Sequence, residues 1–161
     1  MSSYEFKAAG IVPYRFVNDE LEILLAVQVR SNNNPKKELL LHALGGRRME
    51  NEYANECAIR EFLEETSSLH NRFLESDLLA NVKFSTYIPS GKYKLFVFDI
   101  HYLSPESQDY LNQLPLSFTS NREVEYLVWI SPLKLSDSEF GISQFFKYSI
   151  LPAVKQILRI R

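Results

Sequence analysis

Three glutamates stand within five residues near the middle of the chain, at Glu61, Glu64 and Glu65 of the segment REFLEET. In a helix, Glu61 and Glu65 would be direct neighbours, and like charges at that spacing repel by roughly a few tenths of a kcal/mol. Arg60 precedes Glu64 by one helical turn and is the cation expected to neighbour it. The cluster is therefore either the solvated acidic face of a surface helix or a site for a divalent cation such as Mg²⁺, which prefers carboxylate oxygens.

The surrounding hydrophobic pattern predicts a helix from about Tyr53 to Thr66, with the glutamates away from its apolar side. At about 100° per residue, one broad stripe forms the core face. Cys57 lies near the edge of the glutamate side, and we interpret it as a small packing residue rather than a catalytic thiol. The residues of the stripe are Ala58, Ile59, Phe62, Leu63 and Thr66.

The residues before this helix add a longer pattern. Gly46 is followed after five residues by Glu52, and after seven more by the run from Arg60 to Glu65. This spacing resembles the Nudix box, G-x5-E-x7-R-E-U-x-E-E-x-G-U, in which U is a bulky aliphatic residue and Phe62 is an aromatic substitute. Two positions depart from the pattern, because Ser67 replaces the last glycine and Ser68 the last aliphatic residue. These departures affect the scaffold and leave every carboxylate of the box in place.

The resemblance implies a hydrolase in which water attacks the pyrophosphate of a nucleoside diphosphate derivative, with Mg²⁺ or Mn²⁺ as cofactor. It implies metal ligation by the carboxylates of Glu61, Glu64 and Glu65 and by the backbone carbonyl of Gly45. It also implies that Gly46, Glu52 and Arg60 support the loop before the helix. Family members differ in their general base, which is either a helix glutamate or a glutamate before a late strand. Glu123 in TSNREVEYLVWIS is our candidate for that base or for a further ligand, and a surface carboxylate is the alternative.

Five further residues are candidates for substrate binding. Arg47 and Arg48 follow the glycines and could meet phosphates, or could lie in a solvated basic loop. Asp99 and His101 are two apart on an expected strand, so they would share a face and line a cavity or form a structural hydrogen-bonded pair. Tyr87 could stack on a base.

The expected secondary structure interleaves strands and helices, which predicts a mixed sheet between helices. The resemblance likewise implies an α/β fold, a Nudix-type α/β/α sandwich. The expected strands are Phe6 to Val12, ending before Pro13; Leu21 to Arg30; Leu39 to Leu44, running into a Gly45-Gly46 loop; Leu78 to Phe84; Tyr93 to Leu103; and Val124 to Ile130. The expected helices, besides the one above, are a short one after Ser104 as N-cap and Pro105 as first residue, and one from Ile142 to Ile160, broken or kinked near Pro152.

The chain of 161 residues is expected to form a single domain, 1–161. A net charge of −2 gives no global basic field for bulk nucleic-acid binding. A single cysteine, no signal peptide and no membrane-length apolar run lead us to expect an intracellular, cytoplasmic protein, with a nuclear location left open. Oligomeric state is not predicted.

Two functions from different classes stay open. The first is an active pyrophosphohydrolase, whose substrates could be dinucleoside polyphosphates, nucleotide sugars, oxidised nucleoside triphosphates, capped RNA or diphosphoinositol phosphates. The second is a catalytically weak or inactive Nudix module that binds nucleotide, RNA or a protein partner. The intact set of carboxylates favours the enzyme, and the Ser67-Ser68 departure favours the module.

Overall fold

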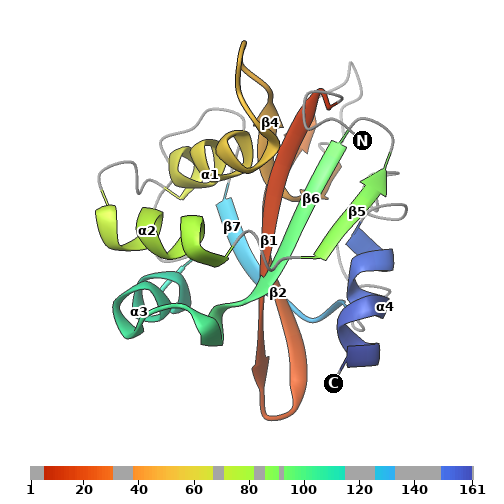
Figure 1. Cartoon of the computed structure of the whole chain (residues 1–161). Coiled ribbons are helices and arrows are strands. Elements are labelled where there is room, and N and C mark those ends of the chain that lie inside the picture. Colours follow the sequence, from red (N-terminus) through yellow and green to blue (C-terminus); the bar gives the residue numbers. More distant parts are fainter. Residues whose placement is uncertain are drawn as a thin grey trace.

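The computed structural model describes residues 6–30, 38–66, 71–81, 86–90, 93–114, 126–132 and 150–160. Within these residues, seven strands form one sheet in the order β3-β2-β1-β6-β5, with β4 also paired to β1 and β7 to β2 (Figure 1). The strands are β1 Ala8–Val17, β2 Glu20–Arg30, β3 Glu38–His42, β4 Leu44–Arg47, β5 Thr86–Ser90, β6 Tyr93–Asp99 and β7 Tyr126–Ile130. The helices are α1 Ala54–Glu65, α2 Arg72–Asn81, α3 Pro105–Asn112 and α4 Leu151–Ile160, with a short 3₁₀ turn, η2, at Ile100–Tyr102.

Helices cover both faces of this mixed sheet. Strand β1 runs parallel to β6, whereas its pairs with β2 and β4 are antiparallel. Helices α1, α2 and α3 lie on one side of the sheet and α4 lies on the other (Figure 1). The protein therefore has the expected α/β/α sandwich architecture.

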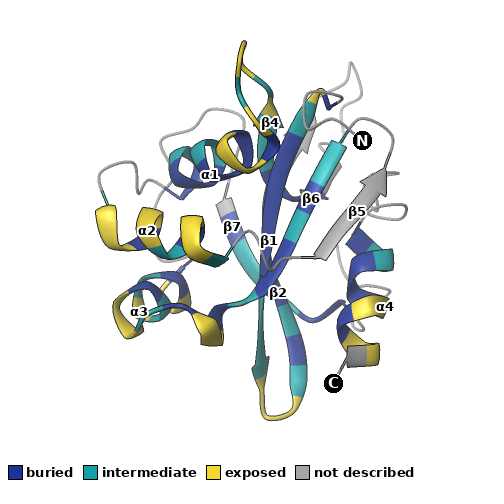
Figure 2. Ribbon diagram, viewed as in Figure 1, coloured by how far each residue is buried: buried dark blue, intermediate teal, exposed yellow. Residues whose placement is uncertain are grey.

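Strand β2 shows why two cores form. Its side chains alternate between the two faces, with Leu24 and Ala26 in the core under α1 and Ile23 and Leu25 in the core under α4. All four are 0% or 1% exposed, and Figure 2 shows the buried residues along the centre of the sheet. A nearly continuous apolar strand is the pattern expected when both faces are covered, so this prediction is confirmed.

Strand β1 continues past Pro13, and the prediction that it ends before this residue is wrong. Along one edge, β1 pairs with β4 through Ala8 to Ile11 and then with β2 from Tyr14 to Val17. Pro13 lies between these two partners, where its missing N–H removes no bond from either antiparallel ladder. The switch of partners thus accommodates a proline inside a long strand.

The glycine pair Gly45-Gly46 was expected in a loop but belongs to β4. Gly45 lies opposite Gly10 of β1, and Gly46 lies opposite Ala9. The chain leaves β3 at His42 and pairs again at once, so one predicted strand becomes two short ones. Pairing with a glycine of β1 holds the two glycines in extended backbone rather than in a turn.

Two further predictions need correction. The expected strand from Leu78 is wrong, because Leu78 lies in α2, where it and Leu74 are buried one turn apart. Asn71 accepts a hydrogen bond from the Leu74 N–H at 3.0 Å and thereby stabilises the start of α2. Strand β6 ends at Asp99, so His101 lies in η2 rather than on the same strand.

The helix predicted around the glutamates is confirmed as α1, and the one after Ser104 is confirmed as α3, with Ser104 as its N-cap. Strand β7 matches the expected late strand, and Pro152 stands in the first turn of α4. Glu123, Ser67 and Ser68 lie outside the described residues. None of the helices in the described part of the chain has the length and apolarity needed to cross a membrane.

Candidate active site

The glycines of β4 bring α1 close to the sheet. Cys57, Glu61 and Glu65 follow one another at four-residue intervals, so they share one side of α1. The Cys57 thiol donates to the Gly46 carbonyl oxygen at 3.5 Å. A Cβ atom on Gly46 would collide with the Glu61 carboxylate, which therefore lies directly over this glycine. The box pattern thus places a carboxylate against the backbone of β4.

Arg60 ties three glutamates and the end of β4 together. Its Nε donates to Glu52 Oε2 at 2.7 Å, and its Nη1 lies 3.0 Å from Glu61 and 3.4 Å from Glu64. Its Nη2 donates to the Arg47 carbonyl oxygen at 3.0 Å. Glu61 therefore shares the cation that helical spacing assigned to Glu64 alone. The hydrogen bond from Arg60 holds the pKa of Glu52 below its usual value, and the same bond raises the pKa of Arg60.

Glu52 also closes the loop between β4 and α1. Its Oε1 accepts the Met49 N–H at 3.0 Å, and its own N–H donates to the Met49 carbonyl at 3.2 Å. Asn51 in this turn has a φ of 63°, a left-handed conformation that asparagine tolerates better than most residues. Glu52 and Arg60 together therefore connect this loop to α1.

The three glutamates differ strongly in exposure. Glu65 is 2% exposed, and the side chains of Glu61 and Glu64 are 14% and 38% exposed. A solvated acidic face is thus the wrong description for Glu65 and Glu61, and it suits only Glu64. A buried carboxylate is costly unless cations or hydrogen-bond donors compensate it. A bound cation would therefore be stabilised most at the buried end of the cluster, near Glu65.

Tyr93 of β6 lies next to this buried end. Its hydroxyl oxygen is buried and occupies the space that a Cβ atom on Gly10 or Gly45 would need. Burial raises the pKa of Tyr93 well above its ordinary value, and the negative charge of Glu65 adds to the shift. Burial likewise raises the pKa of the Cys57 thiol to about 12, so at neutral pH this thiol is protonated and suits packing better than nucleophilic catalysis.

The oxygen-rich chemistry of this region suits a hard divalent cation, but its side chains are not gathered into a metal cage. In the ranges that the structure describes, no three His, Cys, Asp or Glu side chains converge closely enough to hold a metal ion. Glu61 and Glu65 lie on the side of α1 that faces β4, whereas Glu64 lies toward Arg60. Glu61, Glu65 and the Gly45 carbonyl could contribute from this side, and Glu64 would have to turn from Arg60 to join them.

The two arginines after the glycines have different surroundings. Arg48 donates from Nε to the Glu52 carbonyl at 3.1 Å and stacks over Phe6 at 5.2 Å from the ring centroid. The guanidinium of Arg47 is exposed, and it forms no hydrogen bond or ion pair with the residues that the structure describes. Arg47 is therefore exposed at the end of β4, whereas Arg48 is engaged in holding the loop.

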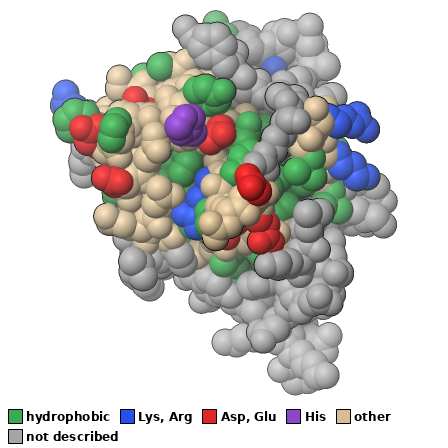
Figure 3. Space-filling model, turned by 90° about the horizontal axis from the view of Figure 1, so that it is seen from below, with side chains coloured by type: hydrophobic (Ala, Val, Ile, Leu, Met, Phe, Trp, Pro, Cys, Tyr) green, Lys and Arg blue, Asp and Glu red, His purple; other side chains and the backbone are tan. Residues whose placement is uncertain are grey.

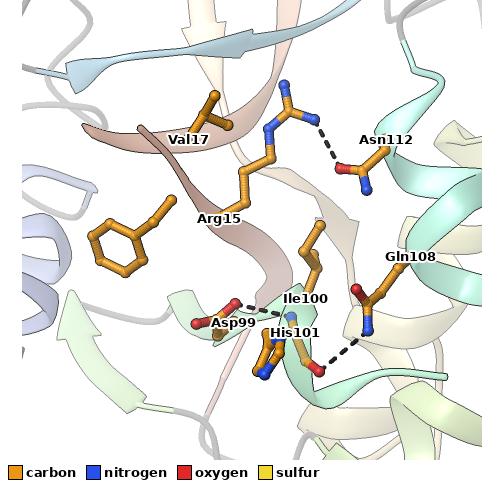
Figure 4. A pocket seen from close by; sticks show the side chains of 8 residues that line it. Arg15, Val17, Asp99, Ile100, His101, Gln108 and Asn112 are labelled. Carbon is orange, nitrogen blue, oxygen red and sulfur yellow. Dashed lines mark hydrogen bonds between the residues drawn. The ribbon is translucent and has the colours of Figure 1, made fainter. Parts of the chain in front are cut away.

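Asp99 and His101 lie at the opposite end of β1 from the glycines. They line a cavity of about 480 Å³ with Arg15, Phe16, Gln108 and Asn112 (Figure 4). Asp99 Oδ1 accepts the backbone N–H of His101 at 2.9 Å, so the two residues also form a structural pair. Arg15 follows Gly10 by five positions, which along a strand is about 17 Å. Figure 3 views this end of the molecule, where acidic, basic and histidine side chains lie among hydrophobic ones.

Sequence reasoning missed Gly10 and Tyr93. Asp99 and His101, expected to line a cavity or to form a structural pair, do both, at the end of β1 far from the glycines. A glycine inside an apolar strand often marks a close approach of backbone or ligand, so Gly10 carried a usable signal. The backbone of Tyr87 lies in β5 opposite Phe96, and nothing is described of its side chain. Nothing in the sequence distinguished Tyr93 from the other eight tyrosines.

The comparisons with known proteins agree on the fold. No protein-family model matches the sequence, and no curated protein does. Among solved structures, a Nudix hydrolase from M. smegmatis, RenU, superposes with a TM-score of 0.58 at 16% identity, covering 98% of this chain and 88% of that one. The Nudix domain of Shewanella oneidensis NrtR, complexed with ADP ribose, gives 0.53 at 10% identity, covering 96% and 88%. The fold of this protein is therefore that of the Nudix hydrolases.

Proposed function

We propose that the protein is a metal-dependent pyrophosphohydrolase that cleaves a nucleoside diphosphate derivative by water attack, within one Nudix domain spanning 1–161. The observation that carries this proposal is the side of α1 pressed onto β4, where Glu61 lies over Gly46 and Glu65 is 2% exposed. Such burial of carboxylates has no evident use in a solubility face, but it suits the binding of a cation.

In this proposal the carboxylates of Glu61, Glu64 and Glu65 and the carbonyl of Gly45 hold Mg²⁺ or Mn²⁺. The ion would supply positive charge against the pyrophosphate oxygens. Arg60 and Glu52 keep the loop and α1 in register through their hydrogen bonds at 2.7 and 3.1 Å. Phosphoryl transfer depends mainly on positioning and electrostatics, so no covalent nucleophile is needed and Cys57 has no catalytic part.

Arg47 is the proposed phosphate contact, because its guanidinium is exposed at the end of β4 next to Gly46. Glu123 remains our proposed general base or further ligand. The ADP ribose bound by the NrtR Nudix domain belongs to the proposed substrate class, so ADP ribose is a natural first probe. An intracellular, cytoplasmic location is part of the same proposal.

The test is hydrolysis of a substrate panel with and without Mg²⁺ or Mn²⁺. The panel holds ADP ribose, dinucleoside polyphosphates, nucleotide sugars, oxidised nucleoside triphosphates, capped RNA and diphosphoinositol phosphates. We expect metal-dependent turnover of at least one compound, and about a thousandfold slower turnover in Glu61→Gln, because a lost ligand removes several kcal/mol of charge stabilisation. Glu75→Gln, an exposed change on α2, is the matched control and should keep wild-type rates.

One observation favours the second candidate, a nucleotide-binding, RNA-binding or protein-binding module. Arg60 already contacts Glu61 and Glu64, and the described carboxylates do not converge as a metal site. A folded protein that binds ADP ribose without hydrolysing any compound of the panel would support this module and contradict the enzyme. Equal activity of wild type and Glu61→Gln would show that the glutamates are not the catalytic centre.

A further inference from the structure

Tyr93 lies on the face of the sheet opposite α1, against Gly10 of β1 and Gly45 of β4. Its ring packs against the core under α4, together with Leu95 of the same strand. The ring also meets the imidazole of His42 edge-on, with centroids 6.4 Å apart. The side chain is therefore anchored among residues that have no part in the proposed metal site.

The hydroxyl end of Tyr93 reaches the backbone of the site. It occupies the space where a Cβ atom on Gly10 or on Gly45 would lie, and these two glycines face each other in the β1–β4 ladder. Neither glycine carries a side chain, so the phenol oxygen comes close to the backbone of Gly45. An alanine at either position would exclude the phenol.

The Glu61 carboxylate lies on the other face of β4, against Gly46, the residue after Gly45. A Cβ atom on Gly46 would point toward the Glu61 carboxylate, and α1 covers this side of the sheet. Glu65 is buried one helical turn after Glu61, on the same side of α1. The polar tip of Tyr93 and the buried carboxylate are thus separated by backbone without side chains.

We propose that Tyr93 is a positioning residue for the metal site, because its hydroxyl lies against Gly10 and Gly45 and braces the Gly45 backbone from the face opposite α1. This inference rests on the proposed function. A phenylalanine would fill the same hydrophobic space, so a residue with only a packing role would not need a buried oxygen against the backbone of Gly45. Groups that hold metal ligands in place from behind commonly contribute to affinity without touching the ion.

The test compares two Tyr→Phe variants by Mn²⁺ binding, measured on the purified protein without substrate by the electron paramagnetic resonance of free Mn²⁺. We expect Tyr93→Phe to weaken Mn²⁺ binding about tenfold. Tyr110→Phe is the matched control, because it removes a hydrogen bond of 2.6 Å to the Thr66 carbonyl at the end of α1. The control should lower the melting temperature at least as much as Tyr93→Phe does, while its Mn²⁺ affinity stays within twofold of wild type.

The outcomes separate the two proposals. Wild-type binding of Mn²⁺ with unchanged affinity in Tyr93→Phe would overturn the role of Tyr93 alone. Equal weakening in both variants would overturn it too, because it would report general destabilisation. A wild-type protein that binds no Mn²⁺ would overturn the proposed function and this inference with it.

A second measurement in the wild-type sequence covers the case in which Tyr93→Phe does not fold. 3-Fluorotyrosine at position 93 alone should show a ¹⁹F resonance that shifts when Mg²⁺ is added, while the same label at position 110 should not respond. A label at 93 that ignores saturating Mg²⁺ would contradict the positioning role.

Discussion

The two ends of β1 both hold an arginine among acidic and polar groups, yet they differ in how charge is balanced. At the glycine end, Arg60 contacts Glu52, Glu61 and Glu64, and Glu65 is buried nearby. At the other end, which we call the hairpin end, Arg15 is paired with Glu22 at 2.8 Å and donates to Asn112. The difference teaches that several carboxylates gathered around one arginine, rather than a cavity as such, mark the candidate active site.

The two ends also differ in how closely side chains approach the backbone. Glycines at 10, 45 and 46 let the phenol of Tyr93 and the carboxylate of Glu61 reach the backbone. At the hairpin end, side chains rather than bare backbone line a cavity, and Arg15 lies 4.0 Å from the centroid of the Trp129 ring. The glycine end should therefore tolerate added atoms poorly, whereas the hairpin end should tolerate loss of charge with little effect on function.

The largest effect expected is from Gly10→Ala. Its Cβ would meet the Gly45 Cα and the Leu44 carbonyl oxygen, each at 2.9 Å, as well as the Tyr93 hydroxyl. Because two of these atoms are backbone and cannot turn aside, we expect a loss of about 3 kcal/mol in the free energy of unfolding. Urea denaturation measures it, and a loss below about 1 kcal/mol would show that the contact is looser than described.

Gly46→Ala should separate function from stability. The three atoms nearest to its Cβ all belong to the carboxylate of Glu61, a flexible group that can move. We expect hydrolysis to fall about a hundredfold, because small displacements of catalytic groups have effects of this size. The melting temperature should change far less than in Gly10→Ala. Full activity in Gly46→Ala would break the link between the position of Glu61 and catalysis.

Matched arginine variants test the two ends directly. Arg60→Met and Arg15→Met each remove several hydrogen bonds to charged or polar groups, and each should lower the free energy of unfolding by about 2 kcal/mol. Only Arg60→Met should slow hydrolysis, by about tenfold, since it supports the glutamates indirectly. Steady-state kinetics and urea denaturation on both variants test this. An equal loss of activity in Arg15→Met would show that the two ends do not differ in function.

Within the glycine end, Arg47 and Arg48 should behave differently. Arg47→Ala should raise KM about tenfold, the value of one charge-assisted hydrogen bond to phosphate, with kcat little changed. Arg48→Ala should instead lower stability, because Arg48 bonds the Glu52 carbonyl and stacks over Phe6. Similar KM values in Arg47→Ala and wild type would remove Arg47 from the proposed phosphate contacts.

The smallest effect concerns pH. Burial lowers the pKa of His42 below its ordinary value of 6.5, so the unfolded chain binds a proton at this residue more readily than the folded one. Stability should consequently fall as the pH drops below about 6.5 and stop falling, for this residue, below the folded-state pKa. Melting temperatures of wild type and His42→Phe between pH 7.5 and 5.5 test this, with the smaller fall expected in the variant.

The local elements were predictable because their signals are local. The apolar period of α1 and the capping pattern of α3 lie within each segment, and both helices formed where expected. Strand β2 was equally predictable, since a continuous run of apolar residues indicates a strand that is buried on both faces. The strand expected from Leu78 failed because a short apolar run fits a strand or a helix, and packing of Leu74 and Leu78 decided for the helix.

The sequence by itself determined which residues share the loop and helix of the box, because their spacing along one helix sets which side chains are neighbours. Tertiary structure decided how these residues differ. Pairing of Gly45 with Gly10 placed the Tyr93 hydroxyl behind the site, and packing of α1 on β4 buried Glu65 while leaving Glu64 near solvent. The tertiary structure also places Asp99 and His101 at the end of β1 far from the glycines. These outcomes depend on contacts between strands distant in sequence, which no local spacing encodes.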